Sequence, residues 1–178
     1  MKSLACMFSN FNSSIWHALW VLLPLGALVY LLSFFSLKKG HCYFFDPKHN
    51  SDQVLKDEGG DFEPHAKRYQ DLAKLAITLS AGAIAFLINF LVSDKASGSV
   101  FAQKVQQVAP IECGFFGSSI ALLVLFMVFQ SYLYEQYCHA PDHNTYTRTK
   151  YAFSLTLGWT GLLSFILGFA WLARNVFA

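Results

Sequence analysis

The sequence predicts an all-α, polytopic integral membrane protein, a single domain over residues 1–178 built as a four-transmembrane-helix bundle. Charged residues make up only 13% of the chain, about half the roughly 25% of an average soluble domain. They are absent from four windows, 3–37, 75–93, 113–134 and 151–173. Hydrophobic residues reach 54%. These patterns exclude a soluble enzyme domain, a disordered tail and a secreted disulfide scaffold.

Each window is long enough for a membrane-spanning helix, which needs about 20 apolar residues to cross roughly 30 Å of hydrocarbon. We place the spans at 15–37, 75–92, 113–134 and 151–173. The apolar runs are continuous rather than alternating, which favours helices over barrel strands. The first run exceeds the 7–15 residues of a typical signal-peptide core, so we expect it to be retained as a span.

The loop at 38–74 is the only sizeable soluble segment, and its two halves differ. Its first half mixes Gly, Asp, Asn, Ser and Pro, which indicates irregular chain. Pro64 suits the first position of a helix. We therefore predict one helix from about Pro64 to Val92, which projects beyond the bilayer into this loop. Its exposed first turns are a candidate docking surface for a partner, formed by Lys67, Arg68, Gln70 and Asp71.

The second connection, 94–111, carries a short apolar stripe of Val and Phe beside Lys104 and two Gln residues. That pattern fits a helix lying in the membrane interface, or a partly buried connecting helix. Nine of the thirteen Lys and Arg residues fall in the loops 38–74 and 135–150. By the positive-inside rule these loops are cytoplasmic. The protein is then expected to be a multi-pass membrane protein with both termini outside, in the periplasm if the protein is bacterial.

Cysteine and histidine residues gather in the same two loops, and the local strings echo each other. Each loop has a Cys followed by Pro-x-His-Asn. Three explanations remain open. Zinc takes four Cys or His ligands, a Cys42–Cys138 disulfide needs an oxidising compartment, and Pro-x-His-Asn is also ordinary turn chemistry. The candidate metal ligands are Cys42, His49, Cys138, His139 and His143. No other cofactor is expected.

Small residues recur in the second, third and fourth spans, where they let helix backbones approach closely in lipid. Such faces serve packing within one bundle or association between copies, and we expect both. The candidate helix-packing residues are Ser80, Gly82, Gly114, Gly117, Gly158, Gly161 and Gly168.

Polar chemistry inside the spans is sparse. Glu112 stands at the start of the third span, and no ionisable residue lies near a membrane midplane, which argues against an ion-coupled carrier. No hydrolase, metalloprotease or phosphate-loop motif is present. The first loop carries seven basic and seven acidic residues, a balance that argues against nucleic-acid binding. The sequence therefore predicts a protein that is not an enzyme.

One stretch carries a resemblance. Residues 69–86, YQDLAKLAITLSAGAIAF, resemble a segment that recurs in small bacterial membrane proteins. In span number, size and bulky first loop, the chain also resembles the four-span membrane subunit of the Kiwa anti-phage defence system. That resemblance implies an inner-membrane oligomer that senses infection and works with a cytosolic partner.

The leading hypothesis is therefore a non-enzymatic, oligomeric sensor or scaffold subunit that couples a membrane event to a cytosolic protein. The alternatives are a pore-forming or depolarising effector, and a membrane immunity or accessory subunit. A membrane enzyme that uses the Cys and His residues ranks last.

Overall fold

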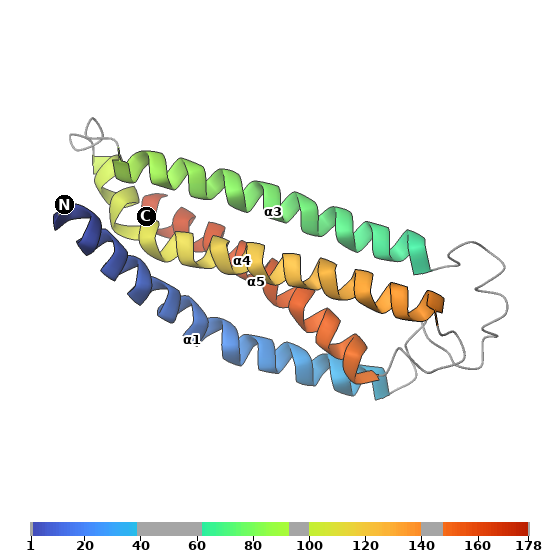
Figure 1. Cartoon of the computed structure of the whole chain (residues 1–178). Helices are drawn as coiled ribbons and strands as arrows, with labels where there is room; N and C mark the ends of the chain where they lie inside the picture. The colour runs from blue at the N-terminus through green and yellow to red at the C-terminus, as the bar shows by residue number, and fades with distance from the viewer. Residues whose placement is uncertain (1, 39–61, 93–99, 140–147, 178) are drawn as a thin grey trace.

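A computed structural model describes residues 2–38, 62–92, 100–139 and 148–177, and all of these residues are helical (Figure 1). The helices are α1 (Lys2–Lys38), α3 (Phe62–Val92), α4 (Val100–His139) and α5 (Arg148–Phe177). The all-α fold class predicted from the sequence is confirmed.

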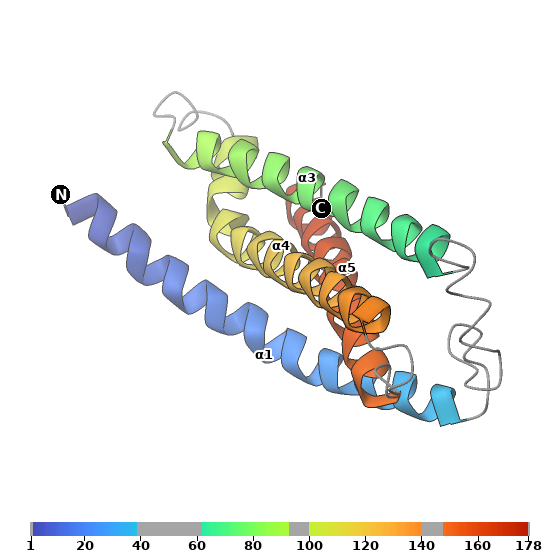
Figure 2. The same cartoon turned by 45° about the vertical axis from the view of Figure 1, so that its right-hand side comes forward.

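The four helices run alongside one another, with α4 and α5 lying between α1 on one side and α3 on the other (Figures 1 and 2). The most extensive contact is between α4 and α5, while α3 packs chiefly on α4, and α1 packs on α5 and α4. The start of α1 and the end of α5 lie at the same end of the bundle as the start of α4.

Each helix is long and apolar enough to cross a membrane. The candidate spans are Ala18–Phe35, Lys67–Phe90, Val100–Glu135 and Thr149–Val176. Helix α4 has 40 residues and is therefore about 60 Å long, twice the roughly 30 Å hydrocarbon core. The chain thus has the architecture of a multi-pass membrane protein, with helices that continue past the apolar windows of the sequence.

Helix α4 bends near its start, in the yellow-green part of Figure 2. Pro110 lies there, inside the helix. A proline has no backbone N–H, and its ring clashes with the carbonyl one turn back, so it bends a helix. The turns before the bend pack against α3, where the Gln106 side-chain amide donates a hydrogen bond to the Phe90 carbonyl at 3.0 Å. This segment is therefore a partly buried connecting helix.

The core forms around α4, which contributes to both apolar clusters. One cluster joins α3, α4 and α5 near the bend, with Phe116 fully buried at its centre. The Phe116 ring meets Phe169 edge-on, with the ring centroids 4.9 Å apart. The other cluster lies further along, where Ala73 and Ala76 of α3 pack near the buried side chains of Leu123 and Phe126. The buried side of α4 therefore contributes residues to both apolar clusters of the bundle.

Candidate functional site

Three of the predicted packing glycines lie in α5 against large side chains of α4. A Cβ atom built on Gly161 would lie 2.8 Å from Cγ of Leu123, and one on Gly168 would lie 2.9 Å from the Phe116 ring. At Gly158 the nearest atoms, in the Phe126 ring, are at 3.2 Å. The distances at Gly161 and Gly168 are shorter than real Cβ contacts, and the distance at Gly158 is shorter than most of them. A side chain at any of these positions would therefore force its neighbour on α4 to shift.

Hydrogen bonds follow the same interface from one end to the other. The Ser119 hydroxyl donates to the Gly161 carbonyl at 2.9 Å, and the Ser164 hydroxyl donates to the Phe115 carbonyl at 2.8 Å. Further along, the Gln130 amide donates to the Ser154 hydroxyl at 2.7 Å. The α4–α5 interface is therefore filled and polar-paired, which is how helices associate where the hydrophobic effect between them is absent.

Of the predicted packing residues in α3 and α4, two have open space around them and two are buried. Gly82 of α3 and Gly117 of α4 would each meet no heavy atom within 4 Å of an added Cβ. Gly114 is buried. Ser80 is fully buried, and its hydroxyl has no hydrogen-bond partner among the described residues. The seven predicted residues therefore do not form one face: some lie inside the bundle and others on its outside.

Gly82 belongs to a line of exposed residues along α3, which we call the outer stripe: Thr78, Gly82, Ala85 and Asn89. Their spacing of four, three and four residues places them on one side of a helix. The buried residues Ala73, Ala76 and Leu87 lie on the opposite side, against α4. Large exposed side chains border the stripe on its flanks, among them Leu75, Leu79, Phe86 and Ile88.

Asn89 is the polar member of the outer stripe. It is exposed, within the candidate span Lys67–Phe90. Its amide makes no hydrogen bond within the described part of the chain. Asn89 lies one residue before the end of that candidate span. Side-chain amides of membrane helices hydrogen-bond across helices when a second helix is present.

The burial of Glu112 is not predicted by the sequence. The sequence placed it at the start of a span, whereas it lies twelve residues after Val100, where the candidate span Val100–Glu135 begins. Its side chain is fully buried, and both carboxyl oxygens lack a hydrogen-bond partner among the described residues. The signal available in the sequence was the apolar stripe before Pro110, which continues the span toward the N-terminus.

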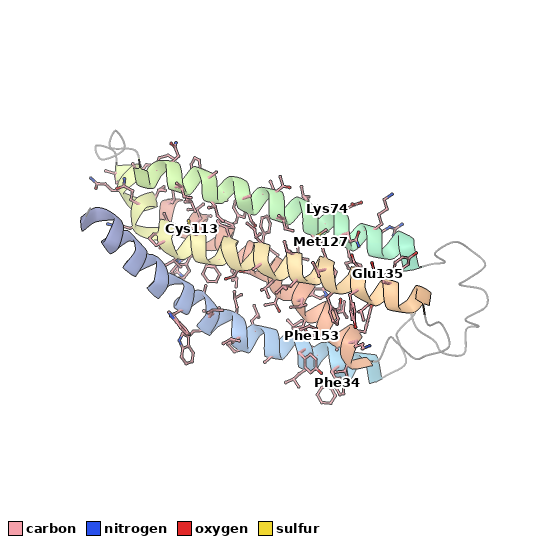
Figure 3. The ribbon with its side chains drawn as sticks, in the orientation of Figure 1. Phe34, Lys74, Cys113, Met127, Glu135 and Phe153 are labelled. Carbon is pink, nitrogen blue, oxygen red and sulfur yellow. The ribbon has the colours of Figure 1, made fainter. Side chains whose placement is uncertain are left out.

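The predicted docking residues lie on the first turns of α3. Lys67, Arg68 and Asp71 are exposed, and Gln70 is half-buried. Asp71 forms an exposed ion pair with Lys74, with 3.6 Å between carboxylate oxygen and ammonium nitrogen. Figure 3 shows Lys74 pointing away from the bundle. Exposed pairs of this kind contribute little stability.

The predicted metal ligands fall outside the part of the chain whose side chains are described. Cys42, His49 and His143 lie outside the described residues, while Cys138 and His139 are backbone positions in the last turn of α4. Among the described residues no group of three His, Cys, Asp or Glu side chains could hold a metal ion. The zinc site and the disulfide stay predictions from the sequence.

Comparison of the chain with protein-family models, curated proteins and solved structures finds no match.

Proposed function

We propose that the protein is a non-enzymatic, multi-pass protein of a bacterial inner membrane whose copies associate along the outer stripe of α3. It acts as a sensor or scaffold subunit that couples a membrane event to a cytosolic partner. The observation that carries the proposal is the contrast between glycines: Gly158, Gly161 and Gly168 pack against α4, whereas a Cβ on Gly82 would meet nothing.

The lipid environment explains why an uncovered face of small residues favours association with a second copy of the protein. Lipid tails solvate Leu as well as a neighbouring helix does, so helices associate in membranes through close backbone packing and interhelical hydrogen bonds. The outer stripe offers both, since Gly82 and Ala85 permit close approach and Asn89 supplies a donor and an acceptor. A stripe that meets its own copy is self-complementary, as two-fold symmetric interfaces are.

The first turns of α3 connect this interface to a partner. Helix α3 has 31 residues and is therefore about 46 Å long, which exceeds the roughly 30 Å hydrocarbon core by several turns. Lys67 and Arg68 lie at the start of the candidate span Lys67–Phe90, on the same helix as Gly82. A change in packing between copies moves this end, which is a recognised way to relay a signal.

The resemblance to the membrane subunit of the Kiwa system supports anti-phage defence as the setting. In that setting the membrane event is infection, and the partner acts in the cytoplasm. The count of Lys and Arg residues supports the same sidedness, because nine of the thirteen fall in the segments 38–74 and 135–150.

The variant Gly82→Leu tests the proposal. We expect it to reduce the assembly to smaller species, since a Leu side chain prevents close approach along the stripe. The matched control is Ala170→Leu, which adds the same bulk at an exposed position on α5 and should leave the assembly intact. Native mass spectrometry in detergent and subunit counting by photobleaching in membranes give the sizes. An unchanged assembly in Gly82→Leu would refute self-association through α3.

A further inference from the structure

Glu112 lies deep in the bundle, close to the bend of α4. Cys113, its neighbour in the chain, is labelled in Figure 3 near that end of the helix, and Glu135 lies near the other end. Glu112 is fully buried with no partner on either oxygen among the described residues, whereas Glu135 is exposed. The two carboxyl groups of one helix therefore stand in opposite environments.

The buried side of α4 shows where Glu112 points. Ser119 and Gln130 follow Glu112 by 7 and 18 residues, spacings that bring all three to one side of a helix of about 3.6 residues per turn. Ser119 and Gln130 both hydrogen-bond to α5, so this side faces α5. In contrast to those two, Glu112 has no hydrogen bond to α5.

The opposing part of α5 is apolar. Gly168 lies against Phe116, and α4 and α5 are antiparallel, so the turn of α4 that holds Glu112 faces the turn of α5 that follows Gly168. In this part of α5, Leu172 and Val176 pack in the apolar cluster with Cys113 and Phe116, while Phe169, Ala170 and Trp171 are exposed. On the α3 side, the same region is filled by the apolar cluster that contains Leu87 and Ala109.

Among the described residues, charged and titratable groups are few around Glu112. On α4 they are Lys104 and Cys113, and on α5 the nearest is Arg174, whose guanidinium lies 5.9 Å from the centroid of the Trp171 ring and is exposed. Helix α3 has none between Lys74 and its end at Val92. On α1 the titratable residues that precede the candidate span Ala18–Phe35 are Lys2, Cys6 and His17, whose side chains lie outside the described part of the chain.

A carboxylate in such surroundings would be an unpaired buried charge, which costs far more than burial of the neutral acid. The neutral acid also carries an O–H donor beside its acceptor. We infer that Glu112 is a proton-binding site of the bundle: it holds a proton while α4 and α5 are packed as seen here, and releases it only when this end of the interface opens to water.

The site gives the proposed sensor a chemical signal. Ionisable groups inside membrane spans are rare and mark proton or ion sites. Glu112 lies at the end of the bundle opposite the loops assigned to the cytoplasm, so the proton comes from the external side. Loss of the proton favours opening between α4 and α5, a change in packing with two discrete states. This step rests on the membrane setting of the proposed function, but not on self-association of α3.

Infrared spectroscopy of the full chain in lipid vesicles tests the inference directly. A neutral carboxylic acid has a C=O stretching band, distinct from those of carboxylates and of the backbone, that shifts in D₂O. We expect this band at neutral pH in the wild type, its loss in Glu112→Gln and its retention in Glu135→Gln. If Glu112→Gln does not fold, Glu112→Asp should keep the band at a changed frequency.

Titration supplies the second readout. As the pH rises, the acid band should give way to a carboxylate band, and alkylation of Cys113 by N-ethylmaleimide should accelerate beyond the acceleration seen in Glu112→Gln. The variant His17→Gln should retain both changes. Absence of the acid band at neutral pH would overturn the site. A titration that His17→Gln abolishes, or a band that persists at alkaline pH, would overturn its role as a proton sensor. The assembly size of the same samples separates either failure from a failure of self-association.

Discussion

Two regions of the bundle are built from small residues, and they differ in what lies against them. In the α4–α5 interface, Gly161 and Gly168 are filled by Leu123 and Phe116, and serine hydroxyls pair with backbone carbonyls. On the outer stripe of α3, Gly82 meets nothing and Asn89 is exposed. A small-residue pattern in the sequence therefore indicates close approach of another helix, while the side of the helix that faces the bundle decides which helix approaches.

The largest effect is expected from Gly161→Leu, which would break the filled interface. An added Cβ alone lies 2.8 Å from Leu123, and overpacking of a close-packed interior costs about 1–3 kcal/mol, occasionally more. We expect loss of at least 3 kcal/mol, roughly the upper end of that range, seen as early unfolding in a thermal or SDS titration. The control Gly117→Leu, at a glycine with open space, should unfold near the wild-type midpoint. Equal midpoints for both variants would contradict the assignment of the interface.

A smaller and different effect is expected from Asn89→Ala on the outer stripe. It should weaken self-association by about 1–2 kcal/mol, the range measured for polar groups between model membrane helices, and leave unfolding of the single chain unchanged. Energy transfer between labelled copies during dilution in detergent measures the association. Ile88→Ala, which truncates an exposed neighbour on the flank of the stripe, serves as the control. If Asn89→Ala lowers the stability of the single chain and leaves association unchanged, Asn89 makes its contacts inside the bundle instead.

The smallest effect is expected from loss of the hydrogen bond between Gln130 and Ser154 in the α4–α5 interface. Gln130 donates to Ser154 at 2.7 Å within buried surroundings. Hydrogen bonds between membrane helices contribute about 0.6 kcal/mol on average, so Gln130→Leu should lower stability by roughly that amount. A double-mutant cycle with Ser154→Ala isolates the pair. A coupling energy of zero would show that the Gln130–Ser154 hydrogen bond adds nothing to the packing of the interface.

Much of the fold follows from the sequence because its signals are local. Windows without charge predict the four helices, and Pro64 marks the region where α3 begins, at Phe62. The direction in which each residue faces depends on contacts between helices, so Gly82 and Gly161 look alike in the sequence but differ in the bundle. Glu112 was placed at a span boundary because the charge itself ended the apolar window, although the helix continues past it to Val100.

The site predictions also depend on whether a feature is local in the sequence or arises from contacts between helices. Lys67 and Arg68 could be placed on an exposed helix end because a polar stretch precedes an apolar one on the same helix. The carboxyl of Glu112 could not be recognised as buried, since burial results from the bend at Pro110 and the packing of α3 and α5 around it. The Cys and His ligands of the loops depend on two segments meeting in space, and they stay a prediction.

Disulfide scanning along α3 tests whether copies of the protein associate through the outer stripe. In a full chain without its native cysteines, single cysteines replace Thr78, Gly82, Ala85 or Asn89 on the stripe, and Leu79 or Ile88 on its flanks. Mild oxidation in membranes should cross-link copies at the four stripe positions and not at the two flanking ones. Cross-linking that is uniform around α3, or confined to the flanks, would contradict association through the outer stripe.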